Sequence, residues 1–403
     1  MIWMPYTTSC VFCGSIHKKV LDLGLHPHSD YFPSSTKYKI TCFPLNLVRC
    51  TNCGLYQIDY HLDKEFLFND NYIYDSSINI GGVKHWDEFA KTTKKIFPKN
   101  IKNLSHLDVG SNAGELNEAF SRIGFNSIGV EPSKDPYKKA LTLGRKSINS
   151  YFDRSLIDKL PYEKFNLITF TNSFPHIPNP YETLRLASEL LDNENGVIVI
   201  ESPSAKMMIN NFQYDQIYHQ HMTYLDFQPL EMLANELNLE IHKMVNTDFH
   251  NGSTRYYISF KNVYKKSIYI EEFLENLSKR SINLNQQDDD FRIGCLKKRD
   301  KLKNLINKYK DENKKICCVS APAKGNTILN YCNLTCNDIP FTTEANILKV
   351  GRYTPLSSLP IKEDSYLSEY KPDAIIILAW NFFDEISNAV KKYAPQSEMY
   401  MPL

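Results

Sequence analysis

The sequence has almost no excess of charge of either sign, because 47 lysines and arginines stand against 46 aspartates and glutamates. A net charge of +1 gives no overall electrostatic reason to bind nucleic acid or an anionic membrane. Long hydrophobic runs are also lacking, since the longest strongly apolar stretch, AIIILAW over 374–380, is far too short to span a bilayer. The amino terminus MIWMPYTTSC has neither the charged region nor the apolar run of a signal peptide. We therefore expect a cytoplasmic monomer with no nucleic-acid and no membrane partner.

The length and composition indicate a soluble protein of several domains. With 403 residues and 42% hydrophobic content, the chain is long enough for two or three domains, each with its own core. The 10 cysteines need an explanation other than a disulfide framework, because a reducing compartment keeps thiols free.

Four of these cysteines form two CxxC pairs, in CVFCG over 10–14 and in CTNCG over 50–54. A CxxC followed by glycine makes a tight turn that points both thiolates at one ion, and two such turns complete a tetrahedral shell. A redox CxxC usually occurs singly at the head of a helix, so that alternative is weaker. The sequence predicts a zinc site, and four protein ligands make it structural. The predicted ligands are Cys10, Cys13, Cys50 and Cys53.

The middle of the chain carries the pattern of a nucleotide-binding half of a doubly wound fold. LDVGSNAGEL over 107–116 precedes a helical stretch and a short strand, SIGVEPS over 127–133, which ends in an acid. Dinucleotide binding would need GxGxxG, and here Asn112 and Glu115 stand at the second and third glycine positions. A glycine turn followed by Glu131 instead favours S-adenosylmethionine, whose ribose hydroxyls the acid would hold. An α/β domain whose glycines only bend the chain is the alternative.

Two further stretches carry candidate chemistry. FNLITFTNSF over 165–174 reads as a strand, so Asn172 and His176 should lie at the carboxyl edge where open α/β sheets bind ligands. DQIYHQHMTYL over 215–225 concentrates groups that donate, accept or move protons. A metal site at His219 and His221 lacks a completing carboxylate or cysteine, which leaves a structural cluster or a proton-transfer site.

The last third predicts a second, smaller α/β domain. About fifty charged, helix-prone residues up to 315 read as a solvated helix pair that links domains. KICCVSAPAKGNTILNY then reads as strand, turn and helix, with Lys324 at a helix start that suits a phosphate. The expected domains are 1–70, zinc-binding; 71–262, a central doubly wound, Rossmann-like domain; and 263–403, C-terminal α/β.

The whole chain resembles the three-domain, zinc-containing C-methyltransferases that act on nucleotide-linked keto-deoxysugars, such as the enzymes of tetronitrose and mycarose biosynthesis. Besides the stretches quoted above, the resemblance is carried by YIYDSS at 72–77, TNSFPHI at 171–177, HNGSTRYY at 250–257 and KVGRYTP at 349–355. The chain departs from the family where Ala113 replaces the usual aspartate and Gln220 replaces the usual glutamate.

The resemblance implies methyl transfer from S-adenosylmethionine to the carbon next to the ketone of a nucleotide-linked 4-keto-6-deoxysugar. Such a carbon attacks only as an enolate, which requires a base and hydrogen-bond donors for the oxyanion. We expect His221 to be the base, with His176 as the alternative, and Tyr218 and Tyr74 to be the donors. Gln220 cannot accept a proton and should only position its neighbours.

The resemblance also implies two binding sites. The cofactor contacts are expected at Asp108, Gly110, Asn112, Gly114, Glu131 and Asn172, and the sugar-diphosphate contacts at Lys324, Asn326 and Arg352. Two other functions stay open: an O-methyltransferase acting on a sugar or related small molecule, and a catalytically inert binding protein stapled by zinc.

Overall fold

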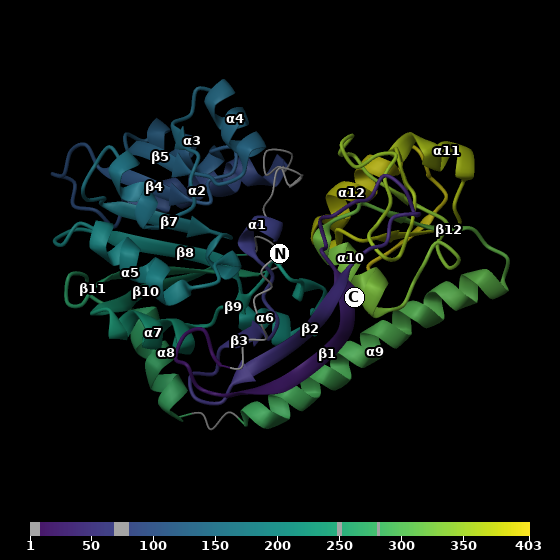
Figure 1. The fold of residues 1–403 in the computed structure, drawn as a ribbon, viewed down its shortest axis with the longest axis horizontal. Coiled ribbons are helices and arrows are strands. Elements are labelled where there is room, and N and C mark those ends of the chain that lie inside the picture. The colour runs from purple at the N-terminus through teal and green to yellow at the C-terminus, as the bar shows by residue number, and fades with distance from the viewer. Residues whose placement is uncertain (1–8, 68–79, 248–251, 280–282) are drawn as a thin grey trace.

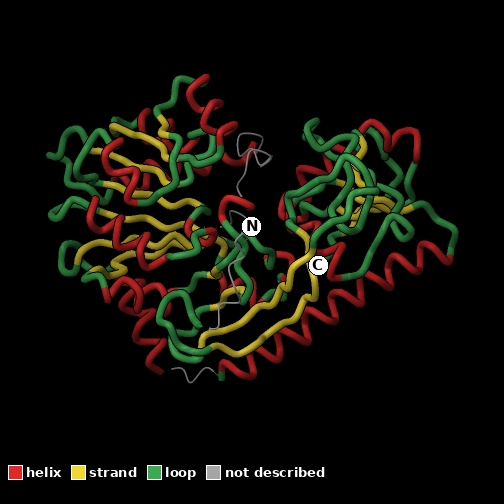
Figure 2. The backbone as a smooth tube through the Cα atoms, in the orientation of Figure 1, coloured by secondary structure: helices red, strands yellow, loops and turns green. Residues whose placement is uncertain are grey.

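The computed structural model describes residues 9–67, 80–247, 252–279 and 283–403. This part of the chain contains three sheets, of four, seven and five strands. Figure 1 shows the seven-stranded sheet in one lobe and the five-stranded sheet in another, with the long strands β1 and β2 and helix α9 running beneath both. Figure 2 shows the same β1–β2 ribbon reaching from the first lobe to the second. The predicted fold class, a zinc-binding domain followed by two α/β domains, is confirmed.

The N-terminal sheet is antiparallel and borrows its last strand from the central part of the chain. Its order is β1 (His17–Pro27), β2 (Cys42–Cys50), β3 (Tyr56–Ile58) and β9 (Thr223–Tyr224). Tyr56 pairs with Tyr224, so the stretch 215–225 leaves the central domain and joins the N-terminal sheet. The predicted proton-handling stretch therefore lies at the junction of two domains.

The central sheet has the order β10-β11-β8-β7-β4-β5-β6, in which β4 to β8 run parallel and β11 runs antiparallel to its neighbours. Its inner strands are continuous apolar runs such as VIVI in β8, as expected where helices cover both faces of a parallel sheet. The strands are β4 (Ser105–Val109), β5 (Asn126–Val130), β6 (Ser147–Ile148), β7 (Leu167–Thr171), β8 (Val197–Pro203), β10 (Leu239–Thr247) and β11 (Ser253–Phe260).

The C-terminal sheet is entirely parallel, in the order β14-β13-β12-β15-β16. The chain begins in the middle at β12 and winds to either side, which places a topological switch point between β12 and β15. Its strands are β12 (Ile316–Val319), β13 (Thr342–Thr343), β14 (Ile361–Lys362), β15 (Ala374–Ile377) and β16 (Glu398–Tyr400).

The helices of the central domain are α2 (Ile80–Lys94), α3 (Glu115–Arg122), α4 (Lys134–Thr142), α5 (Pro180–Leu190), α6 (Ala205–Asn210), α7 (Phe227–Glu236) and α8 (Ile268–Lys279). The others are α1 (Lys64–Leu67), α9 (Leu284–Asp311), α10 (Ala323–Tyr331), α11 (Leu367–Tyr370) and α12 (Phe383–Val390). Among the described residues, no helix combines the length and apolar character needed to cross a membrane.

Helix α9 packs more closely than the solvated linker that its charged sequence suggested. It buries Phe291, Cys295 and Ile306 in a core shared with β1, β2 and the C-terminal domain. Near its start, Asp288 forms a buried ion pair with Arg49 of β2, with 2.8 Å between Nη2 and Oδ2. Helix α9 thus has an apolar stripe and a buried ion pair, and both pack it against the zinc-binding domain.

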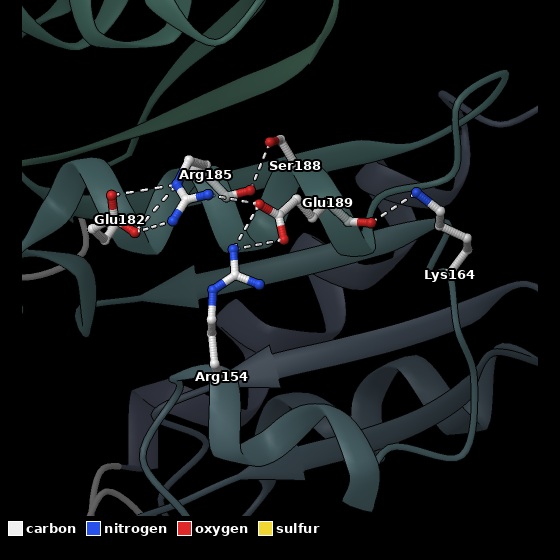
Figure 3. A network of polar contacts seen from close by, with 6 residues as sticks. All are labelled: Arg154, Lys164, Glu182, Arg185, Ser188 and Glu189. Carbon is white, nitrogen blue, oxygen red and sulfur yellow. Dashed lines mark hydrogen bonds and ion pairs between the residues drawn. The ribbon is translucent and has the colours of Figure 1, made fainter.

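The outer face of α5 carries a network of exposed ion pairs (Figure 3). Glu189 accepts from Arg185 of the same helix and from Arg154 of the 3-10 helix η2 (Arg154–Lys159). Lys164 donates to the main-chain oxygen of Glu189 at 2.7 Å. The network links η2 to α5. Because solvent screens exposed ion pairs, it adds little to the free energy of unfolding.

Buried histidines should make the fold sensitive to acid. Burial lowers the pKa of His26, His61 and His242 to about 4, and of His106 and His219 to about 3. Unfolded histidines take up protons near pH 6.5, so below that pH the unfolded state binds more protons and stability falls. As the pH falls below 6.5, each buried histidine lowers the free energy of unfolding by up to about 1.4 kcal/mol per pH unit, until the pH reaches the pKa of that histidine in the folded state.

The measurement is the midpoint of urea unfolding at pH 7.5, 6.5 and 5.5, with zinc content followed in parallel. We expect little change above pH 7 and a steep fall below 6.5. A constant midpoint down to pH 5.5 with zinc retained would show that these histidines do not resist protonation.

Candidate active site

The four cysteines of the two CxxC turns converge on one point. Their Sγ atoms all lie within 4.8 Å of one another, with Cys10 3.6 Å from Cys53 and Cys13 3.5 Å from Cys50. Four thiolates at the usual Zn–S distance of about 2.3 Å stand roughly 3.8 Å apart in a tetrahedron, so the cluster fits zinc. Backbone N–H groups point at the sulfurs, as in Cys53 N to Cys50 Sγ at 3.4 Å.

The cysteine cluster is buried and suits a structural metal rather than a catalytic one. Cys10, Cys50 and Cys53 are buried in the same core as the central domain's sheet. With four protein ligands the ion has no position for a substrate. The ion would therefore join the two CxxC turns of the N-terminal domain, and the packing of three of the cysteines places that domain against the central one.

The β4–α3 turn brings backbone close to where a ligand would lie. Gly110 and Gly114 adopt φ of 74° and 81°, which favour glycine. A Cβ on Gly110 would stand 2.6 Å from the Cβ of Ser173, so the turn is also packed too tightly for a side chain. Asn112 lies between them at φ 48°, and its Oδ1 accepts from the N–H of Ala113.

Glu131, just after β5, is fixed by this turn. Its Oε2 accepts from Asn112 N at 2.9 Å and its Oε1 from Ser133 N at 2.7 Å. Burial raises the pKa of Glu131, while these two N–H donors oppose that shift. The side chain of Ser133 also bonds this carboxylate, so Glu131 is held by three hydrogen bonds beside the β4–α3 turn.

Asp108 and Asn172 lie on neighbouring strands of the same edge. Asp108 in β4 accepts from Thr169 Oγ1 at 2.6 Å, and burial raises its pKa to about 7. Asn172, after β7, has φ 56°, and among the described residues its buried Oδ1 has no hydrogen-bond partner. Ala113, which stands where the resembling family usually has aspartate, is fully buried. The chain therefore lacks a carboxylate at this packed position.

The stretch 215–225 contains a Tyr–His pair. It begins in the 3-10 helix η4 (Tyr214–Gln216), and His221 Nδ1 donates to the main-chain oxygen of Gln216 at 2.9 Å. In the neutral imidazole that bond places the hydrogen on Nδ1 and the lone pair on Nε2, which accepts from the Tyr218 hydroxyl at 2.7 Å. Both side chains are only half-buried.

His176 completes this group from the central sheet. It ends the 3-10 helix η3 (Phe174–His176) after β7, and its ring centroid lies 5.1 Å from that of His221. Its Nδ1 donates to the main-chain oxygen of Gln220. Burial lowers the pKa of His176. The structure thus brings together His176, Tyr218 and His221, the groups that the sequence singled out.

His219 and Gln220 point the other way, into the N-terminal domain. His219 Nε2 donates to the main-chain oxygen of Pro44 at 3.1 Å, against the ring of Phe43. Gln220 donates to Asp30. His219 and His221 therefore do not converge on one point, so this pair does not form the metal site that the sequence analysis had disfavoured.

The other predicted contacts have separate places. Tyr74 lies outside the described residues. Lys324 stands at the start of α10, 5.1 Å from the ring of Trp380, and burial lowers its pKa to about 8. Asn326 and Arg352 donate to the main-chain oxygens of Ser29 and Phe32, at 2.6 and 3.1 Å.

Sequence reasoning missed a buried acid beside Lys324. Asp215 in η4 is fully buried and accepts from Trp380 Nε1 at 2.8 Å. Burial raises the pKa of Asp215, and Lys324 opposes that shift. Nothing local marks this trio, because its members come from η4, α10 and the segment after β15.

Family models match three consecutive parts of the chain. A putative zinc binding domain covers residues 10–68, a methyltransferase domain 84–244, and a C-methyltransferase C-terminal domain 248–402. The chain is 25% identical over 356 residues to C-methyltransferase NovU of Streptomyces niveus, covering 88% of this chain and 84% of that protein.

Two solved structures that are similar to the chain each match less than half of it. Magnesium protoporphyrin IX methyltransferase from Synechocystis is 11% identical, with a TM-score of 0.36, over 46% of this chain and 82% of that one. An S-adenosylmethionine-dependent methyltransferase from Clostridium acetobutylicum is 16% identical, with a TM-score of 0.34, over 44% of this chain and 92% of that one.

Proposed function

Since the chain belongs to the three-domain, zinc-containing C-methyltransferases, which use S-adenosylmethionine, we propose that it methylates the carbon next to the ketone of a nucleotide-linked 4-keto-6-deoxysugar. The observation that carries the proposal is the contact of the Tyr218 hydroxyl with His221 Nε2, beside His176. The pair supplies a neutral imidazole and a phenol, the two groups that enolate formation requires.

The pair can serve both needs in one rearrangement. A sugar α-carbon placed against His221 Nε2 replaces the Tyr218 hydroxyl as the partner of that lone pair. The hydroxyl can then donate to the keto oxygen, where negative charge develops as the proton moves to the imidazole. The bond from Nδ1 to Gln216 orients the ring and stabilises the imidazolium that forms. S-adenosylmethionine supplies the methyl group that the carbon attacks.

The C-terminal domain supports a nucleotide-linked substrate through Lys324. Within the described residues Lys324 makes no hydrogen bond, whereas Asn326 and Arg352 already donate to the loop around Phe32. Its ammonium therefore keeps its donors for an incoming group, and a diphosphate suits it. Of the three predicted contacts, Lys324 is the one we place at the diphosphate.

Two measurements test the function. Calorimetry with S-adenosylmethionine should show binding by folded, zinc-loaded protein, and no binding would leave only an inert binding protein. Mass spectrometry of a panel of nucleotide-linked 4-keto-6-deoxysugars incubated with enzyme and cofactor should show a methylated product for at least one. No product from any keto sugar would reject the proposed substrate class.

Glu131→Ala should weaken S-adenosylmethionine binding while sparing the proton-transfer group. The change removes the acceptor for the ribose and leaves Asn112 N and Ser133 N without their partner. Losing hydrogen bonds to a charged group costs about 1.5–3 kcal/mol, so Kd should rise roughly 10- to 100-fold. The matched control is Glu163→Ala, an exposed acid of the same domain. Equal affinity of both variants for the cofactor would remove Glu131 from the binding site.

A further inference from the structure

The loop over residues 28–33, between β1 and β2, touches both other domains. On the C-terminal side, its main-chain oxygens accept from Asn326 Nδ2 at Ser29 and from Tyr353 N at Pro33, at 2.6 and 3.0 Å. On the central side, Asp30 Oδ2 accepts from Gln220 Nε2 at 2.9 Å. One short segment of the zinc-bearing domain thus connects the C-terminal domain to the proton-transfer stretch.

Phe32 anchors this loop in the C-terminal domain. Its ring is 2% exposed and packs against Ala321, just after β12, and Ile361 of β14. The ammonium of Lys349 lies 4.7 Å from the ring centroid and donates to the oxygen of Ala321 at 2.8 Å. The attraction between a cation and an aromatic ring is stronger when the pair is shielded from water than when it is exposed. The position of Asp30 is therefore set by packing outside the central domain.

Asp30 determines how the side chain of Gln220 is oriented. Gln220 is 1% exposed, and within the described residues its Oε1 has no hydrogen-bond partner. Leaving a buried acceptor unpaired is costly, so the amide orientation must be set by its NH2 group. The opposite orientation would place Oε1 against the carboxylate of Asp30. The contacts of Nε2 with Asp30 Oδ2 at 2.9 Å and with His28 Nε2 at 3.3 Å, both on this loop, thus fix the orientation of the Gln220 amide.

Gln220 in turn positions the side chain of His176. The main-chain oxygen of Gln220 accepts from His176 Nδ1, and the His176 ring lies beside that of His221. The histidines on which Asp30 acts electrostatically are His28, on its own loop, and His176 on η3. For both, the charge of Asp30 raises the pKa that burial lowers.

We propose that Asp30 is a positioning residue for the proton-transfer group: a carboxylate carried by the zinc-bearing domain, held by the C-terminal domain, that fixes Gln220 and supplies the charge which its amide lacks. The proposal rests on the proposed function for its effect on catalysis. It has a consequence for the titration of His176 that does not need a substrate. The three domains then meet at one site, because each contributes to the placement of a single carboxylate.

The test compares Asp30→Asn with Asp30→Glu and with Asp22→Asn, an exposed acid on β1 that pairs with Lys19. Histidine NMR titration, with the His176 signal assigned by its absence in His176→Ala, should show a lower pKa for His176 in Asp30→Asn only. The kcat of Asp30→Asn should fall by about 10- to 100-fold, as for a small misplacement of catalytic groups. If His176 rather than His221 removes the proton, the acidic limb of the kcat profile should also move to lower pH, because His176 without the Asp30 charge stays neutral further into acid.

Asp30→Glu keeps the charge and should keep the His176 titration near that of the wild type, whereas Asp22→Asn should change nothing. A second variant, Phe32→Ala, removes the anchor and should reproduce the direction of Asp30→Asn while zinc is retained. An unchanged titration and kcat in Asp30→Asn would overturn the proposal. So would equal losses in Asp30→Asn and Asp30→Glu with lowered melting temperatures, which mean a structural role only. If no keto sugar is methylated, the function fails but the titration still decides on Asp30.

Discussion

His221→Ala should lower kcat by roughly 10²- to 10⁴-fold, the loss typical of a positioned general base. The affinity for S-adenosylmethionine should stay nearly intact, because Glu131 and the β4–α3 turn belong to other elements than the stretch 215–225 that carries His221. Exchange of the sugar's α-proton with solvent, where the wild type shows it without cofactor, should fall in parallel. The measurements are kcat, calorimetric Kd for the cofactor, and exchange followed by NMR.

Two variants serve as controls for this result. Tyr218→Phe removes only the hydroxyl that contacts His221 Nε2, so it should slow the chemical step while leaving the imidazole in place. Glu131→Ala should show the reverse pattern, with weak cofactor binding and intact proton exchange. If His221→Ala turns over near the wild-type rate while His176→Ala is inactive, His176 is the base and the Tyr–His pair only shapes the pocket.

Cys10→Ser and Cys53→Ser should yield misfolded or insoluble protein. A four-cysteine zinc site contributes folding free energy directly, with apparent values of about 10–16 kcal/mol in small zinc domains, as much as a typical domain's whole stability of about 5–15 kcal/mol. Here the cluster also lies in the core shared with the central sheet, so its loss should affect both domains. The checks are soluble yield, circular dichroism and elemental analysis, with one zinc per chain expected for the wild type.

Cys336→Ser is the matched control, because Cys336 is exposed and lies outside the cluster. It should be soluble and retain zinc. Active wild-type protein without zinc, or folded Cys53→Ser with normal melting, would show that the thiols only pack.

Local chemistry made several features predictable from the sequence. The CxxCG turns position both thiolates within a few residues, and the glycine turn with Glu131 forms one strand–turn–helix–strand unit. The fold class followed from the same short patterns. The density of Tyr218, His219, Gln220 and His221 marked the stretch, because few cores can satisfy so many polar groups.

Contacts between distant segments could not be predicted in this way. Neighbouring residues of the marked stretch face opposite domains: His221 contacts Tyr218, whereas His219 reaches Pro44 on β2. The partner of Gln220 is Asp30, 190 positions away, and Asn326 contacts Ser29 across 297 positions. Such pairs depend on how three domains dock, and no periodicity or spacing records that.

The most direct test of carbon methylation uses a nucleotide-linked 4-keto-6-deoxysugar that carries deuterium on the carbons next to the ketone. The sugar is incubated with S-adenosylmethionine and the enzyme, and the product is analysed by mass spectrometry and NMR. We expect a new carbon–carbon bond and loss of deuterium from the methylated carbon, because His221 must remove that hydron before the carbon can attack. A product methylated at oxygen with all its deuterium retained would contradict enolate chemistry and leave an O-methyltransferase.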